Sequence, residues 1–167
     1  MKIVGNVFYT YDTQYGIIII ESNGSAITSI KITGAAKPEG KKTADKLTDK
    51  AAGQLGEYFS GKRKVFDIPI NPQGTKFQLC VWNALKDIPY GETRSYKEIA
   101  IATGNHKACR AVGLANNKNP IWIIIPCHRV IGANGTLTGY GGGLEMKQNL
   151  LDLEKINNEA GRNKETI

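Results

Sequence analysis

Apolar and polar residues alternate over short stretches in the first third of the chain. Three β-branched runs cover residues 3–9, 16–21 and 26–32, and the turn residues Asp12 and Asn23-Gly24 separate them. Alternation between turn residues is typical of strands, so we expect a small sheet here, followed by a loop over 34–42.

The spacing then changes to that of a helix. Apolar residues recur three and four positions apart over 43–59, and Gly61 follows them as a stop signal. A short strand is expected over 66–70, before the turn residues 71–74. We therefore place a first domain, made of a sheet and a helix, at 1–74.

Residues 75–117 have the pattern of three helices. Thr75 can cap the first, and Ser95, with Glu98 three positions later, can form a capping box at the start of the second. The third is expected over 107–117, after a tight turn at Gly104. Two short helices joined by a glycine turn are typical of a helix-turn-helix.

The remaining elements complete a second domain over 75–157. They are an apolar strand at 121–125, a glycine-rich loop at 132–143 and an amphipathic helix at 144–157. The polar residues 158–167 are expected to form a mobile tail. The fold class is therefore α+β, with a small sheet-and-helix domain followed by a mainly helical one.

Composition narrows the functional classes. The net charge of +7 favours polyanionic partners, although a basic soluble surface would have the same composition. The apolar runs are too short for a membrane span, and the first residues lack a signal-peptide pattern. Three cysteines without a CxxC pair indicate free thiols and no zinc site. We expect a cytoplasmic protein.

Cys127 is the candidate nucleophile. It follows an apolar run and Pro126, and His128 and Arg129 come directly after it. A thiol is mostly protonated at neutral pH and needs a base or positive charge nearby to become a nucleophile. A small buried cysteine is the alternative, and it suits Cys80 and Cys109 better.

Two helices supply further candidates. Arg110 and Gly113 share one face of the third helix, where a nucleic-acid backbone could approach, although an ordinary surface arginine would give the same pattern. In the last helix, Glu154 falls on the apolar face and needs a partner, either Lys147 or His128. A glutamate that orients a histidine next to a cysteine follows the general logic of an activated nucleophile. A partly exposed glutamate near a frayed end is the alternative.

Seven segments in order resemble the O6-alkylguanine-DNA alkyltransferase family. They are FQLCVW (77–82), IPYGETRSY (88–96), GNHKACRAVGL (104–114), NP (119–120), IPCHRVI (125–131), YGGGL (140–144) and KQNLLDLE (147–154). The resemblance implies a ribonuclease-H-like first domain and a winged helix-turn-helix-like second one. His106 stands where the family often has proline.

The resemblance also implies roles for individual residues. Cys127 would accept the alkyl group, His128 would act as base through a water, and Glu154 would orient His128. Asn119 would brace the helix end against the active-site strand, and Lys147 would help to position the nucleophile. The remaining catalytic, DNA-contacting and base-pocket residues would be Tyr96, which interacts with the leaving guanine; Arg110, which fills the gap in the stack; Ser95, Asn105, Gly113 and Arg129, which contact DNA; and Val130, Tyr140, Gly141 and Gly142, which line the pocket.

These roles amount to direct-reversal DNA repair without a cofactor or metal. The alkyl group of O6-alkylguanine, and to a lesser extent O4-alkylthymine, would pass irreversibly from a flipped-out base in double-stranded DNA to Cys127. We expect a monomer with no obligate protein partner. The alternatives are a cysteine hydrolase that uses Cys127, His128 and Glu154, and a non-enzymatic module that only binds the lesion.

Overall fold

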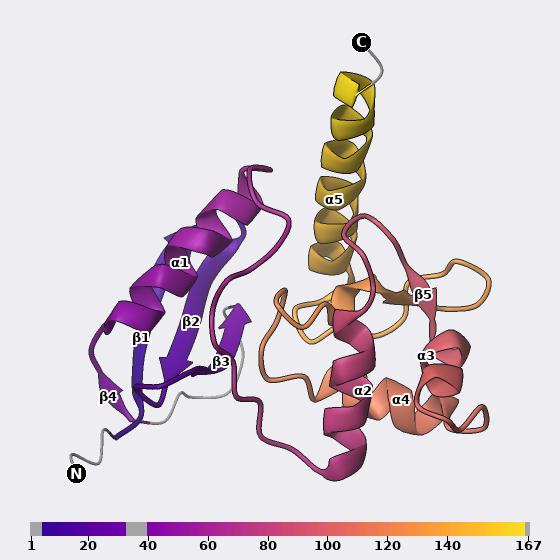
Figure 1. Cartoon of the computed structure of the whole chain (residues 1–167), viewed down its shortest axis with the longest axis horizontal. Coiled ribbons are helices and arrows are strands. Elements are labelled where there is room, and N and C mark those ends of the chain that lie inside the picture. Colours follow the sequence, from indigo (N-terminus) through magenta and orange to yellow (C-terminus); the bar gives the residue numbers. More distant parts are fainter. Residues whose placement is uncertain (1–4, 33–39, 166–167) are drawn as a thin grey trace. The chain divides into compact units, whose positions relative to one another are not determined.

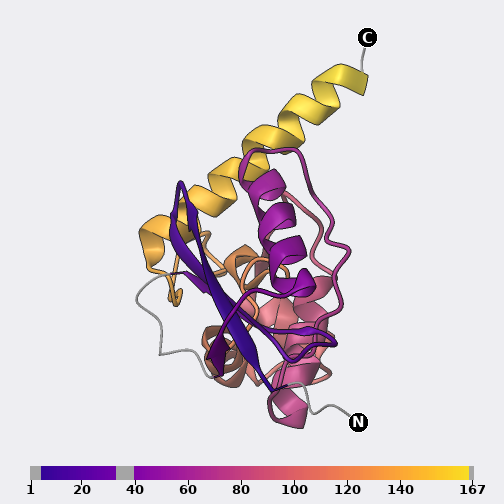
Figure 2. The same ribbon diagram turned by 90° about the vertical axis from the view of Figure 1, so that its left-hand side faces the viewer.

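The computed structural model describes residues 5–32 and 40–165, and the chain forms two compact units. The first unit comprises Met1–Gln73 together with Pro120–Trp122, and the second comprises Gly74–Asn119 and Ile123–Ile167. The sequence predicted a boundary after residue 74 but did not predict that residues 120–122 join the first unit. Figures 1 and 2 show the two units in colours that follow the sequence.

The first unit is a four-stranded sheet with one helix. Its strands β1 (Val7–Thr13), β2 (Gly16–Ser22), β3 (Ile27–Ile32) and β4 (Lys41–Lys42) lie in the order β3-β2-β1-β4. β1 and β2 form an antiparallel hairpin with its turn at residues 14–15, not at Asp12 as the sequence suggested. Residues 3–4 of the expected first strand and 34–39 of the expected loop lie outside the described residues.

Helix α1 (Lys46–Phe59) packs on this sheet because one of its faces is apolar (Figure 2). Asp45 caps it through a reciprocal pair of hydrogen bonds with Thr48, so the helix begins three residues later than expected. Its core-facing side chains meet the alternate buried positions of β2, Ile18 and Ile20. Of the strand expected over 66–70, only Ile70 bridges to the sheet, at Ile27.

The segment 121–125 is not the continuous strand that its apolar sequence predicted. Ile30 of β3 donates its N–H to Pro120 O at 2.9 Å and accepts from the N–H of Trp122 at 3.0 Å, so residues 120–122 extend the sheet of the first unit. Ile123 then has a φ of 73°, an unusual conformation for a β-branched residue. This bend returns the chain to the second unit just before Cys127.

The second unit begins with three helices, α2 (Lys76–Lys86), α3 (Tyr96–Ala102) and α4 (Cys109–Asn117). The cap expected at Thr75 and the capping box expected at Ser95 are present, and Gln78 makes the Thr75 cap a capping box as well. Gly104 has a φ of 85° in the turn between α3 and α4, as a helix-turn-helix requires. Trp82 of α2 is buried against α4 and donates its indole N–H to Ala115 O at 2.9 Å.

The PCHRV segment (126–130) forms a turn that leads into a short parallel strand pair. Cys127–Arg129 form a single 3₁₀ turn, and β6 (Val130–Ile131) continues from it to pair with β5 (Arg94–Ser95) in parallel. Helix α5 runs from Leu144 to Glu165, so the prediction that it ends at Asn157 is wrong. Good helix formers such as Glu159 and Ala160 outnumber the weaker Asn158, Gly161 and Asn163 past that point, and Arg162 and Lys164 suit the negative end of the helix dipole.

Candidate active site

Cys127 lies on a turn rather than on a strand. Its N–H donates to Ile125 O at 2.8 Å, and the side chain is only 3% exposed. Burial raises the pKa of the Cys127 thiol to about 11, although the Asn119 side chain, the charge of Lys147 and nearby backbone N–H groups act in the opposite direction. The thiol is therefore held neutral until something accepts its proton. Cys80, in contrast, is exposed, and Cys109 is half-buried, so neither is the buried cysteine expected.

His128 and Glu154 form a buried pair. His128 Nε2 lies 2.7 Å from Glu154 Oε1, and both side chains are at most 1% exposed. This settles which of the two candidate partners Glu154 has, because Lys147 makes other contacts. The carboxylate assigns the proton of a neutral imidazole to Nε2, which leaves the lone pair on Nδ1. Among the described residues, Nδ1 has no hydrogen-bond partner.

The pKa values of this pair move in the direction that base catalysis needs. Burial lowers the pKa of His128, and the interaction with Glu154 only partly opposes it, so the imidazole is neutral. Burial tends to raise the pKa of Glu154, but His128 and Arg129 outweigh that effect and hold it well below the ordinary value. The site therefore combines an ionised carboxylate with a neutral histidine.

The resemblance implied that Arg129 contacts DNA, but its side chain is buried. Its guanidinium donates to both carboxylate oxygens of Glu154, at 2.8 and 2.9 Å, and to Ile88 O at 2.7 Å. It also lies over the ring of Tyr90, 5.6 Å from the centroid. A cation this close to a buried carboxylate is held inside the fold, where a phosphate does not reach it.

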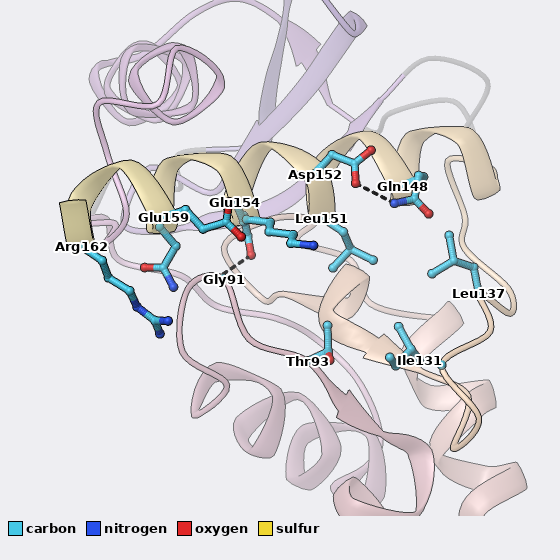
Figure 3. A pocket seen from close by; sticks show the side chains of 13 residues that line it. Gly91, Thr93, Ile131, Leu137, Gln148, Leu151, Asp152, Glu154, Glu159 and Arg162 are labelled. Atoms are coloured by element: carbon cyan, nitrogen blue, oxygen red, sulfur yellow. Dashed lines mark hydrogen bonds between the residues drawn. The ribbon is translucent and has the colours of Figure 1, made fainter.

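Gly91 donates the fourth hydrogen bond to Glu154, after one from His128 and two from Arg129, and the sequence pattern did not indicate this contact. Its N–H donates to Glu154 Oε2 at 3.2 Å, shown as a dashed line in Figure 3. Its φ of 79° is unfavourable for other residues, and a Cβ there would lie 2.6 Å from the Asn158 side chain.

Two asparagines brace the turn that carries the nucleophile. Asn119 donates its side-chain N–H to Ile125 O at 2.8 Å, in agreement with the bracing role that the resemblance implied. Asn116 is 2% exposed and donates to Cys127 O at 3.2 Å, a contact that sequence reasoning missed. Its place on the buried face of α4, beside Val112 and Ala115, was the available signal.

Lys147 and Tyr96 meet at one backbone carbonyl. Lys147 is fully buried and donates to Thr138 O at 3.0 Å, and the hydroxyl of Tyr96 donates to the same oxygen at 2.9 Å. Burial lowers the pKa of Lys147, and the nearby Cys127 thiol partly opposes this shift. The glycine-rich loop is thus tied to both residues on its way from β6 to α5.

The other expected DNA-contacting residues lie on or beside α3 and α4. Arg110 is exposed, and Gly113 lies next to Tyr96, whose ring would be 3.9 Å from an added Cβ. Ser95 caps α3, and the exposed Asn105 accepts the N–H of Lys107 with its side chain. Ala111, next to Arg110 on α4, is exposed as well.

The expected base-pocket residues are only partly enclosed. Val130 is fully buried and the hydroxyl of Tyr140 is buried, whereas Gly141 and Gly142 are exposed. A separate cavity of about 470 Å³ lies along α5 (Figure 3). It reaches Glu154 but is lined by none of Cys127, His128 and Val130, so it is not the site of the nucleophile. Within 5–32 and 40–165, no group of His, Cys, Asp or Glu side chains could hold a metal ion.

Two family models together match most of the chain. The ribonuclease-like domain of 6-O-methylguanine DNA methyltransferase matches residues 6–72, and the DNA-binding domain of the same family matches residues 76–156. The chain belongs to the O6-alkylguanine-DNA alkyltransferase family. The match confirms the family that the PCHRV and neighbouring segments indicated.

Individual alkyltransferases and their structures agree with this assignment. The methylated-DNA–protein-cysteine methyltransferase of Methanosarcina acetivorans is 66% identical over 62% of this chain and 67% of its own. The enzyme of the same name from Mycolicibacterium paratuberculosis is 46% identical over 92% of this chain and 94% of its own. The crystal structure of Mycobacterium tuberculosis OGT in complex with DNA superposes with a TM-score of 0.86, at 46% identity, over 90% of this chain and 94% of that one.

The structure and the solved relatives confirm the expected α+β fold class. A sheet unit precedes a mainly helical one, as in the solved relatives. The first unit matches a domain described as ribonuclease-like. In the described part of the chain, no helix is both long enough and apolar enough to cross a bilayer.

Proposed function

We propose that this alkyltransferase repairs DNA by moving the alkyl group from O6 of guanine to Sγ of Cys127, once per molecule. Its relatives are named methylated-DNA–protein-cysteine methyltransferases, and one solved relative is bound to DNA. The observation that carries the proposal is the buried thiol of Cys127 directly beside the His128–Glu154 pair, in a unit that also holds a helix-turn-helix.

The first step is removal of the thiol proton. Glu154 fixes the imidazole of His128 so that Nδ1 carries the lone pair, and a water passes the proton from Sγ to Nδ1. Lys147 favours the thiolate that results, because its ammonium is held nearby by Thr138 O. Burial keeps the resting thiol neutral, so stray alkylating agents and oxidants find little thiolate.

The second step is displacement at saturated carbon. The sulfur forms a bond to the alkyl carbon as the carbon–O6 bond breaks, and the guanine takes up the electron pair. Tyr96 donates a hydrogen bond, or its proton, to the leaving base. The product is a thioether, which water does not cleave, so each molecule acts once and needs no cofactor.

The substrate must leave the helix for this geometry to work. An alkylated guanine pairs poorly, so extruding it takes less than the few kcal/mol needed for a normal base. Arg110, exposed on α4, then occupies the gap in the stack. The substrate is double-stranded DNA that carries O6-alkylguanine, with O4-alkylthymine as a lesser one, and binding weakens with salt. The chain acts as a monomer in the cytoplasm, without an obligate protein partner.

Mass spectrometry tests the proposal directly. The protein is mixed with a duplex that contains one O6-methylguanine, and intact and peptide masses are measured beside a Cys127→Ser control. One methyl group on the Cys127 peptide, saturating at one per protein, is the expected result. Binding without a mass change would indicate a lesion-binding module instead, and turnover of an ester or amide would indicate a cysteine hydrolase.

A further inference from the structure

One large side chain on the exposed face of α4 is apolar. Leu114 is 68% exposed, although the helix buries Val112, Ala115 and Asn116 on its opposite side. A single exposed leucine is common on protein surfaces and by itself means little. Its surroundings make this one informative.

Leu114 lies one helical turn after Arg110 and one turn before Lys118, so the three side chains are neighbours on the helix surface. Asn117 and Gly113 flank this row. The backbone at Gly113 has no side chain to hold a partner away, and Tyr96 lies just beyond it. The exposed leucine is thus in the middle of the surface that the proposed mechanism turns toward the substrate.

Charge identifies the partner that fits this surface. Residues 105–118 include Lys107, Arg110 and Lys118 and contain no aspartate or glutamate. A face with only cationic and neutral side chains suits a polyanion, and the cations would contact phosphates. An apolar group between them suits the part of a nucleic acid that is not charged, the deoxyribose walls and base edges of the groove.

We propose that Leu114 is an apolar DNA contact, which packs against the deoxyribose wall of the groove that α4 enters, beside the position of Arg110. The inference rests on the proposed function, in which α4 faces the damaged duplex. Leu114 supplies affinity that does not depend on ion release, whereas Arg110 and Lys118 supply the part that does. Apolar side chains also contact sugars and base edges in other DNA-binding proteins.

Salt dependence separates these two contributions. Binding to a duplex with one O6-methylguanine is measured by fluorescence anisotropy over a series of salt concentrations, in a Cys127→Ser background that prevents transfer. Leu114→Ala should weaken binding about tenfold at every salt concentration, as expected for lost apolar contact, without changing the slope of log K against log salt. Lys118→Ala should reduce that slope by about one.

Ile156→Ala is the matched control, because Ile156 is also an exposed apolar helix residue, at 64%, but lies on α5. It should bind as the parent does. Equal affinity of Leu114→Ala and the parent, or an equal loss in Ile156→Ala, would overturn the inference, and so would a change of slope in Leu114→Ala.

A second readout separates this inference from the proposed function. With Cys127 present, Leu114→Ala should react with the free base O6-benzylguanine at the parental rate, because its active site is intact, and should react more slowly with the duplex at subsaturating DNA. If the parent itself gains no alkyl group from the duplex, the proposed function fails. If the parent is alkylated and Leu114→Ala is alkylated equally fast, only the role of Leu114 fails.

Discussion

Replacing Glu154 by glutamine should destabilise the second unit strongly. The carboxylate is 1% exposed and accepts hydrogen bonds from His128 at 2.7 Å, from two nitrogens of Arg129 at 2.8 and 2.9 Å, and from Gly91 at 3.2 Å. Glutamine has nearly the same shape, but one of its oxygens becomes an NH₂ group that faces other donors. The buried guanidinium of Arg129 also loses its counter-charge.

The size of the effect follows from that unpaired charge. Removing one partner of a buried ion pair costs about 3–5 kcal/mol, whereas an exposed pair contributes at most about 1 kcal/mol. A small domain is stable by only about 5–15 kcal/mol, so Glu154→Gln should remove a large share of that stability. Transfer should slow too, because a neutral amide no longer stabilises the positive charge that His128 acquires when it accepts the thiol proton.

Urea unfolding followed by tryptophan fluorescence measures the change. Trp82 lies in the second unit and Trp122 in the first, so the series is made in a Trp122→Phe background. In the double variant Arg129→Met/Glu154→Gln, the loss should be smaller than the sum of the two single losses, because no buried charge is left alone. A loss below about 1 kcal/mol for Glu154→Gln would refute the reasoning, since that is the range of an exposed pair.

Three further outcomes follow from the pKa values and contacts of the site. Since the pKa of the Cys127 thiol is about 11, its reaction with iodoacetamide should accelerate about tenfold per pH unit between pH 7 and 9, and peptide mass spectra should show the exposed Cys80 reacting faster at pH 7. Burial lowers the pKa of His128 in the folded protein, so the stability that the neutral imidazole gives is present above the unfolded pKa of about 6.5 and is lost as the pH falls below it. The urea midpoint of the parent should therefore drop between pH 7 and pH 5.5. A drop of the same size in His128→Gln would contradict this. Lys147→Met keeps the length of the side chain but removes the ammonium that favours the Cys127 thiolate. Transfer from a free alkylated base should slow about tenfold, as expected if the pKa of Cys127 rises by about one unit, and an unchanged rate would contradict this.

Local rules were sufficient for much of the fold. The capping boxes at Thr75 and Ser95 depend on side chains three residues apart, so the sequence alone locates both helix starts. The path of residues 121–125 could not be predicted in this way. Their apolar character is compatible with a strand, but the bend at Ile123 arises because Ile121 pairs with Ile30, which is distant in sequence.

The same distinction applies to the site. A carboxylate on an apolar helix face must have a partner, and this reasoning correctly named His128 as one of two candidates for Glu154. The role that the resemblance implied for Arg129 was wrong, because an arginine next to a catalytic pair has the same sequence signature whether it points outward or inward. The contacts of its guanidinium with Ile88 O and the ring of Tyr90 are seen only in the folded structure.

Because Pro120–Trp122 belong to the first unit, the second unit cannot be expressed alone without them. A fragment that starts at Gly74 would seem to contain the whole nucleophile-bearing unit. It would also carry Ile121 and Trp122, two apolar residues whose backbone partner, Ile30, remains in the other piece. The fragment would then present a bare strand edge that ends five residues before its reactive thiol, and such edges promote self-association. Co-expression of the two pieces, or polar replacement of Trp122, would be the way to keep it in solution.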